Sequence, residues 1–116
     1  MNLIECYSAL GGNYEDVLRR LTSERLVKKF AVKFLDDKSY GLLENSLSEN
    51  NIDEAFRAAH TIKGVCANLG FDKLLHSSSE ITEALREGNI DMANELFPIV
   101  TEDYLLTINS IKSLDE

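Results

Sequence analysis

The chain has 116 residues, enough for one domain with a single modest hydrophobic core. Its formal net charge is −8 and its pI is near 4.7, which argues against nucleic acid and against an anionic membrane surface as partners, because both need a basic face. Hydrophobic residues make up 44% of the chain and it holds one proline, a composition that favours an all-helical fold.

No apolar run approaches the ~20 residues of a membrane-spanning helix. The residues after Met1 show no basic region followed by an apolar stretch, so the N-terminus does not resemble a secretory signal. Cys6 and Cys66 do not suggest a disulfide, because Cys66 falls on the apolar side of a predicted helix. Two thiols in a chain without an export signal indicate a reducing compartment, and we expect a cytoplasmic protein.

Two short helices are predicted near the N-terminus, over residues 3–10 and 14–21. Each follows an asparagine that can serve as the N-cap and has an acidic residue three positions later, as in Asn2 with Glu5 and Asn13 with Asp16. A pair of glycines separates the two helices, where the chain has to break.

The apolar patterns that follow predict five more helical segments, over residues 23–35, 38–48, 52–69, 71–87 and 90–114. Asn51 with Glu54 marks the start of the third of these segments, and Gly70 is a natural residue to end it. Pro98 falls inside the last segment, where it should kink the helix or mark the first turn of a second one.

Amphipathic helices joined by short connections imply an antiparallel four-helix bundle with additional short N-terminal helices. We expect one domain over residues 1–116, with the short helices in 1–22 and the bundle in 23–114. In a central hairpin that turns at Phe71, His60 and Thr82 each lie eleven residues from the turn and therefore at the same height. Arg86 lies one turn beyond Thr82.

The candidate site lies in the middle of the 52–69 helix, whose apolar residues recur at helical spacing and form one stripe. His60 lies beside this stripe, and Lys63 and Gly64 follow at i+3 and i+4, so all three share one face. A glycine inside a helix costs about 1 kcal/mol relative to alanine, which calls for a reason. Gly64 either leaves His60 open, because a side chain there would lean over it, or allows a close helix crossing.

The string from Ala59 to Gly64, followed by Gly70 ten residues after the histidine, resembles the histidine-containing phosphotransfer (HPt) domain of phosphorelays. The resemblance implies that His60 accepts a phosphoryl group on Nε2, from a receiver-domain phosphoaspartate or a histidine kinase, and passes it to a response-regulator aspartate. It implies that Lys63 stabilises this group and that the chain has no kinase or phosphatase activity of its own.

The partners implied are a response-regulator receiver domain and a sensor or hybrid histidine kinase. We expect no cofactor in this chain, since Mg²⁺ would come with the receiver domain, and we expect a monomer.

The sequence departs from this family at Thr82, where many members carry glutamine or glutamate to hold the histidine ring. A threonine hydroxyl is shorter and could reach the ring through a water, or Ser79 or Glu83 could substitute for it. Arg86 corresponds to a basic position near the site in some members.

His76 has no glycine or lysine at i+3 or i+4, and we interpret it as a surface histidine. No cluster of His, Cys and Asp has convincing metal-ligand spacing. The alternative function is a non-catalytic helical adaptor or dimerisation bundle. The chain begins with methionine and could be a complete small protein, or it could be the phosphoacceptor domain of a larger kinase.

Overall fold

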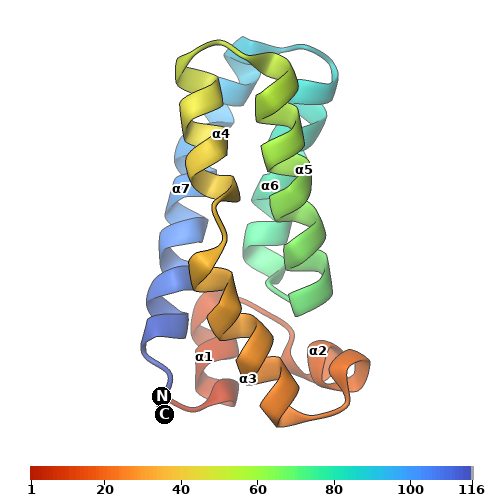
Figure 1. The fold of residues 1–116 in the computed structure, drawn as a ribbon, viewed down its shortest axis with the longest axis vertical. Helices are drawn as coiled ribbons and strands as arrows, with labels where there is room; N and C mark the ends of the chain where they lie inside the picture. Colours follow the sequence, from red (N-terminus) through yellow and green to blue (C-terminus); the bar gives the residue numbers. More distant parts are fainter. Residues whose placement is uncertain (116) are drawn as a thin grey trace.

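The computed structural model describes residues 1–115, and the chain over this range is built from helices and short connections (Figure 1). In chain order the elements are α1 (Leu3–Leu10), α2 (Tyr14–Leu21), α3 (Glu24–Lys33), the 3-10 helix η1 (Phe34–Asp36), α4 (Ser39–Ser48), α5 (Ile52–Leu69), α6 (Asp72–Arg86) and α7 (Ile90–Lys112). Within residues 1–115, no helix combines the length and the apolar character needed to cross a membrane.

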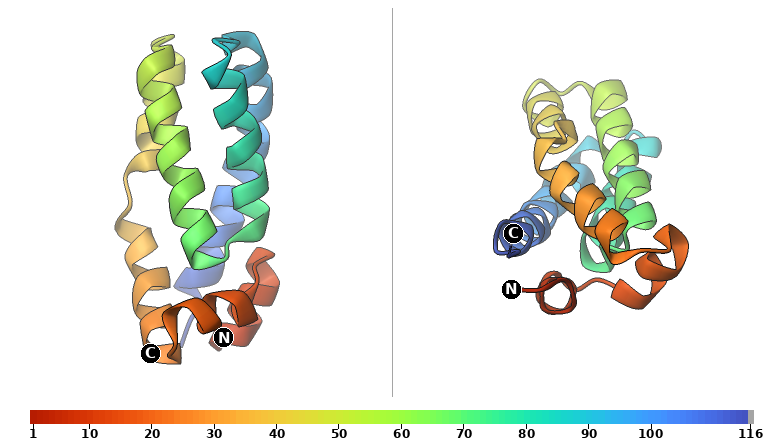
Figure 2. Two further views of the ribbon diagram at one scale, coloured as in Figure 1. Left: turned by 90° about the vertical axis from the view of Figure 1, so that its right-hand side faces the viewer. Right: turned by 60° about the horizontal axis from the view of Figure 1, so that its bottom comes forward.

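Four antiparallel columns of helix run along the 40 Å length of the domain. Helix α5 packs between α4 and α6, and α7 packs against α6 (Figure 1). Helix α3 lies end to end with α4, so these two helices together form one interrupted column, which Figure 2 shows from the side. Helices α1 and α2 lie at one end of the bundle, where α1 packs against α7. The predicted fold class, an all-α antiparallel four-helix bundle with short N-terminal helices, is confirmed.

The predicted bounds of α1, α2 and α5 agree with the structure, and the predicted start signals are confirmed. The side chains of Asn2, Asn13 and Asn51 each accept a hydrogen bond from the backbone N–H three residues on, and Asn2 with Glu5 forms a full capping box. These helices were predictable because their ends are determined by neighbouring residues.

The bounds of the other segments differ from the prediction in places. The segment predicted over 23–35 ends at Lys33 and continues as η1, whose Phe34 packs its ring against Phe71 and Tyr104. The last helix ends at Lys112 instead of residue 114. It runs unbroken through Pro98, so the suggestion that this proline begins a second helix is wrong.

The core runs the length of the bundle and is made of buried side chains from all four columns. At one end, an aromatic row connects the N-terminal helices to the bundle through Tyr7, Phe71, Phe34, Tyr104 and Tyr40, with neighbouring ring centroids 4.1–6.1 Å apart. Such pairs stabilise by about 0.5–1.5 kcal/mol each beyond the area they bury. The row fixes α1 and η1 against the turn between α5 and α6.

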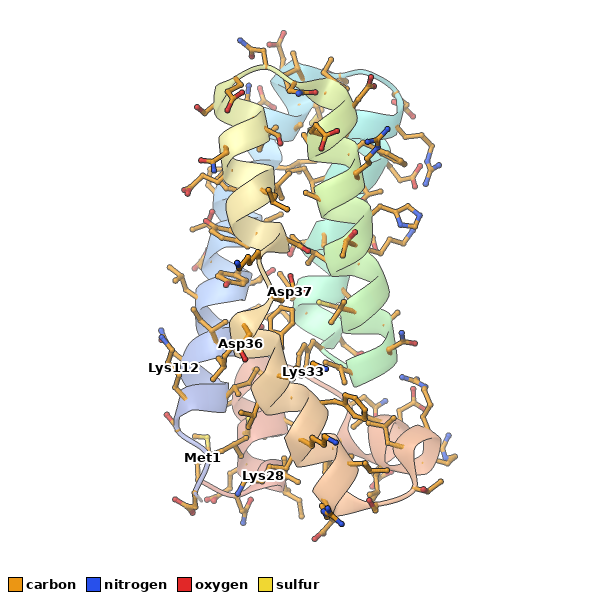
Figure 3. All side chains as sticks on the ribbon, in the orientation of Figure 1. Met1, Lys28, Lys33, Asp36, Asp37 and Lys112 are labelled. Atoms are coloured by element: carbon orange, nitrogen blue, oxygen red, sulfur yellow. The ribbon has the colours of Figure 1, made fainter. Side chains whose placement is uncertain are left out.

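Met1 lies near Lys28 of α3 (Figure 3) and contacts residues that follow α7. The N-terminal ammonium of Met1 donates to the Asp115 carboxylate at 2.9 Å and to the Ser113 carbonyl at 3.0 Å. Lys28 of α3 donates to the Asp115 carbonyl. These contacts hold α7 and α3 together at the end of the bundle where α1 begins.

The C-terminal end of α5 leaves four carbonyl groups without partners inside the helix, and residues 1–22 supply a partner for each. Arg20 donates to the carbonyls of Ala67, at 2.7 Å, and Asn68. The hydroxyl of Tyr7 donates to the Leu69 carbonyl at 2.7 Å. The backbone N–H of Asn13 donates to the Gly70 carbonyl at 2.8 Å. The N-terminal helices therefore cap the helix that carries His60.

Replacement of Arg20 should show how much this cap contributes to the stability of the protein. Arg20→Met keeps most of the side-chain stem but removes the guanidinium from the two carbonyls, so we expect the free energy of unfolding to fall by about 1–2 kcal/mol. Chemical denaturation of the two proteins measures the difference.

Arg19→Met is the matched control. Arg19 and Arg20 contact the same carboxylate, that of Asp16, each at 3.2 Å, but among the described residues Arg19 makes no hydrogen bond or salt bridge to α5. A change of a few tenths of a kcal/mol is expected there. Equal losses in the two variants would mean that the Asp16 ion pairs, and not the α5 cap, explain the effect.

Candidate functional site

Helix α5 presents His60 to solvent from a rigid position. Its inward stripe is buried and includes Ala55, Ala59, Ile62, Cys66 and Leu69, as the periodicity predicted. The two acidic residues in its first turn complement the positive end of the helix dipole. His60 itself is exposed, so the ring lies on the outer side of a helix that is fixed along its inner side.

Gly64 leaves open space one turn beyond His60. A Cβ atom built at Gly64 would meet no other heavy atom within 4 Å. The suggestion that Gly64 permits a close helix crossing is therefore wrong. A side chain at position 64 would lean toward the N-terminal turn, over His60. The open space is compatible with the access interpretation of Gly64, which stays a prediction.

Lys63 lies one turn from His60 and is half-buried. Within residues 1–115, no acidic side chain forms a salt bridge with its ammonium group. On a helix surface, residues three apart are neighbours with Cβ atoms about 5–6 Å apart. The ammonium group can therefore reach an anion that is bound at His60.

One contact across the hairpin bears on the predicted height of Thr82. Phe56 and Arg86 are each fifteen residues from Phe71, and the Arg86 guanidinium carbon lies 5.0 Å from the centre of the Phe56 ring. This contact is compatible with a register in which Thr82 lies level with His60, and that pairing stays a prediction. The Thr82 side chain is fully buried, however, whereas His60 is exposed.

The hydroxyl of Thr82 donates to the Ser78 carbonyl of its own helix at 2.6 Å. The two substitutes named from the sequence also have other partners, since Ser79 donates to the Leu75 carbonyl at 2.7 Å and Glu83 pairs with Arg86 at 3.2 Å. Among residues 1–115, no hydrogen bond joins the His60 ring to any of these side chains. A role for Thr82 in holding the ring stays a prediction.

Two neighbours of His60 that the sequence argument did not single out as site residues are Phe56 and Arg57. The Phe56 ring lies 5.7 Å from the His60 ring, in an edge-to-face arrangement with an interplanar angle of 67°. Arg57 is exposed and pairs with Glu54 at 3.0 Å. The signal was present, because i−4 and i−3 are neighbours of a helical residue just as i+3 and i+4 are.

The other titratable and metal-binding candidates do not form a second site. His76 is exposed and its Nε2 lies 2.9 Å from the Glu80 carboxylate, so it is a surface histidine as predicted. Within residues 1–115, no three His, Cys, Asp or Glu side chains are placed to hold a metal ion. Cys6 and Cys66 are free and buried. Burial raises the pKa of the Cys66 thiol, which therefore stays protonated and unreactive at neutral pH.

The sequence of the chain is similar to part of one known signalling protein. The chain is 32% identical over 72 residues to the chemotaxis protein CheA of Borreliella burgdorferi, an alignment that covers 60% of this chain and 8% of that protein. The chain thus corresponds to a small part of this relative. No solved structure matches the chain.

The family model described as "Hpt domain" matches residues 37–112, which is more than half of the chain. The matched residues run from α4 to α7 and include His60, Lys63 and Gly64. A match of this extent shows that the chain belongs to the Hpt domain family, whose members are phosphotransfer modules of two-component signalling that interact with kinases and receiver domains and are not themselves kinases or phosphatases.

Proposed function

We propose that His60 is the phosphoacceptor of this chain. It would take a phosphoryl group from the phosphoaspartate of a receiver domain, or from a histidine kinase, and pass it to the aspartate of a response regulator. The observation that carries this proposal is the open space at Gly64 beside an exposed imidazole. A receiver's active site has to close over the ring, and α5 offers room for it on that side.

The transfer from a phosphoaspartate is a substitution at phosphorus. The lone pair of His60 Nε2 attacks, the N–P bond forms, and the bond between phosphorus and the aspartate oxygen breaks, with its electron pair leaving on the carboxylate. The ring keeps its proton on Nδ1 during this step. The reverse step onto a second aspartate returns the imidazole unchanged. We expect Mg²⁺ to come with the receiver domain.

Local charge supports this assignment even though the chain as a whole carries −8. Lys63 lies at i+3 from His60 and Arg57 at i−3, and Arg86 lies on the Phe56 ring beside the imidazole. Cations at these places favour the incoming phosphoryl oxygens. Lys63 is the best placed of the three, because Arg57 and Arg86 each pair with a glutamate.

His60→Gln should keep the fold, because the exposed side chain contributes little to the core. It should accept no phosphate, because the amide lacks the nucleophilic imidazole nitrogen. Incubation with a phosphorylated receiver, followed by a count of acid-labile, base-stable phosphate, measures this. His76→Gln should accept phosphate as the parent does. Label on His60→Gln would move the chemistry to another residue, and binding of the receiver without any label on the parent would favour the adaptor function.

Lys63→Ala should slow transfer to His60 or shorten the lifetime of the phosphohistidine, because it removes a cation that lies one helical turn from the imidazole. The melting temperature should change little, since Lys63 makes no salt bridge in the described chain. Lys29→Ala, at an exposed position of α3, is the control for a lost surface charge. Parent values for both rate and lifetime would make Lys63 an ordinary surface lysine.

Gly64 substitutions should separate stability from access. Gly64→Ala should raise the free energy of unfolding by up to ~1 kcal/mol, because its Cβ meets nothing and alanine favours the helix. Gly64→Gln should slow transfer by its bulk alone, because it adds no charge. Thermal unfolding and the transfer rate from a phosphorylated receiver are the two measurements.

Gly70→Ala is the contrasting variant. Gly70 has φ of +71° and a Cβ there would lie 2.8 Å from the Asn13 carbonyl oxygen, so this change should destabilise the protein. Transfer at the parent rate by Gly64→Gln would be incompatible with the access argument.

A further inference from the structure

We propose that Phe56 is the positioning residue for His60, and that Arg86 acts by holding the Phe56 ring in place. This inference rests on the proposed function, because it concerns how the phosphoacceptor ring is presented. It assigns the orientation of the imidazole to an aromatic contact within α5, not to a hydrogen bond from α6.

The helix places Phe56 where the His60 side chain leans. Side chains on a helix point back toward the N-terminus, so the imidazole lies over the residue four positions earlier. The two rings are 5.7 Å apart between centroids and inclined at 67°, which is a favourable edge-to-face geometry. Gly64, His60 and Phe56 therefore follow one another along one face of α5. Gly64 leaves open space, His60 is the nucleophile, and Phe56 supports the His60 ring.

Within residues 1–115, the polar side chains of α6 that were candidates to hold the ring make hydrogen bonds to other groups and none to His60. The hydroxyls of Thr82 and Ser79 each donate to a carbonyl of α6, and the carboxylate of Glu83 accepts from Arg86. Within residues 1–115, Phe56 is the aromatic side chain paired with the imidazole. This ring–ring contact is the interaction that holds the imidazole in the described part of the chain.

Arg86 fixes Phe56 from the neighbouring helix. Its guanidinium carbon lies 5.0 Å from the Phe56 ring centre, and its Nε donates to both Glu83 carboxylate oxygens at 3.2–3.3 Å. Phe56 is only half-buried, so without this cover one side of its ring would face solvent. Glu83 contacts Arg86, Arg86 contacts Phe56, and Phe56 contacts His60. These contacts connect the imidazole to α6 without involving the imidazole nitrogens. Within the described residues neither ring nitrogen has a hydrogen-bond partner, and the ring is held through its carbon framework.

The consequence is a division of roles between the basic residues. Lys63 would act on the phosphoryl group itself, whereas Arg86, in addition to the charge it contributes, would act on the ring that supports the nucleophile. Removal of the Phe56 ring should let His60 sample more rotamers and should slow transfer about two- to tenfold, the range that the strength of aromatic pairs sets. It should leave the chemistry of the phosphohistidine unchanged once this has formed.

The test compares Phe56→Leu with Phe56→Tyr, which keeps the ring, and with Arg86→Met, which loosens the ring without touching the core. Phe30→Leu is the control, because Phe30 is a partly exposed phenylalanine on α3. The readouts are the Hα–Hβ scalar couplings of His60, which report its χ1 rotamers by NMR, the transfer rate from a phosphorylated receiver, and the hydrolysis rate of the isolated phosphohistidine.

The proposal expects averaged His60 couplings and slower transfer in Phe56→Leu and Arg86→Met, with parent behaviour in Phe56→Tyr and Phe30→Leu and an unchanged hydrolysis rate in all of them. Parent couplings in both Phe56→Leu and Arg86→Met would overturn it. Absence of phosphate on the parent protein would instead reject the phosphoacceptor function, and the couplings would still decide whether Phe56 orients the ring.

Discussion

The turn at Gly70 and Phe71 is the constraint on which the site depends, because it fixes how α5 and α6 lie against each other. Gly70 takes a left-handed conformation that a side chain would strain, and the N–H groups of both residues donate to the Cys66 carbonyl. The fully buried Phe71 ring packs between the rings of Tyr7 and Phe34, and this packing holds the turn in place. A change in this turn would shift every pair of residues that meets across the hairpin.

The same turn explains why residues 1–36 matter to a domain whose family match covers 37–112. The free carbonyls at the end of α5 are bonded by Tyr7, Asn13 and Arg20, and the Asn13 backbone lies so close to Gly70 that only glycine fits. A helix end that faces protein has to be satisfied by protein groups. The N-terminal helices therefore stabilise the histidine helix at its far end and leave its middle free for a partner.

The structure also shows how an acidic domain can present a locally basic site. The cations nearest to His60 come from its own helix, at i−3 and i+3, and from Arg86 across the hairpin. Arg57 and Arg86 each pair with a neighbouring glutamate, which fixes the position of the guanidinium group and partly neutralises its charge. Lys63 alone among these cations has no salt bridge in the described chain, which is the basis of the role proposed for it.

The sequence by itself determined what lies within one helix. The bounds of α5 follow from Asn51 and Gly70, and the grouping of His60, Lys63 and Gly64 follows from the helical repeat, since both depend only on local geometry. The tertiary structure decided which contacts form between side chains of different helices. The Thr82 hydroxyl could bond its own backbone or reach across to α5, and only packing selected the Ser78 carbonyl. Likewise, the contact of Arg86 with Phe56 and of Arg20 with the end of α5 joins residues that no local pattern connects, because their meeting depends on how separate helices pack.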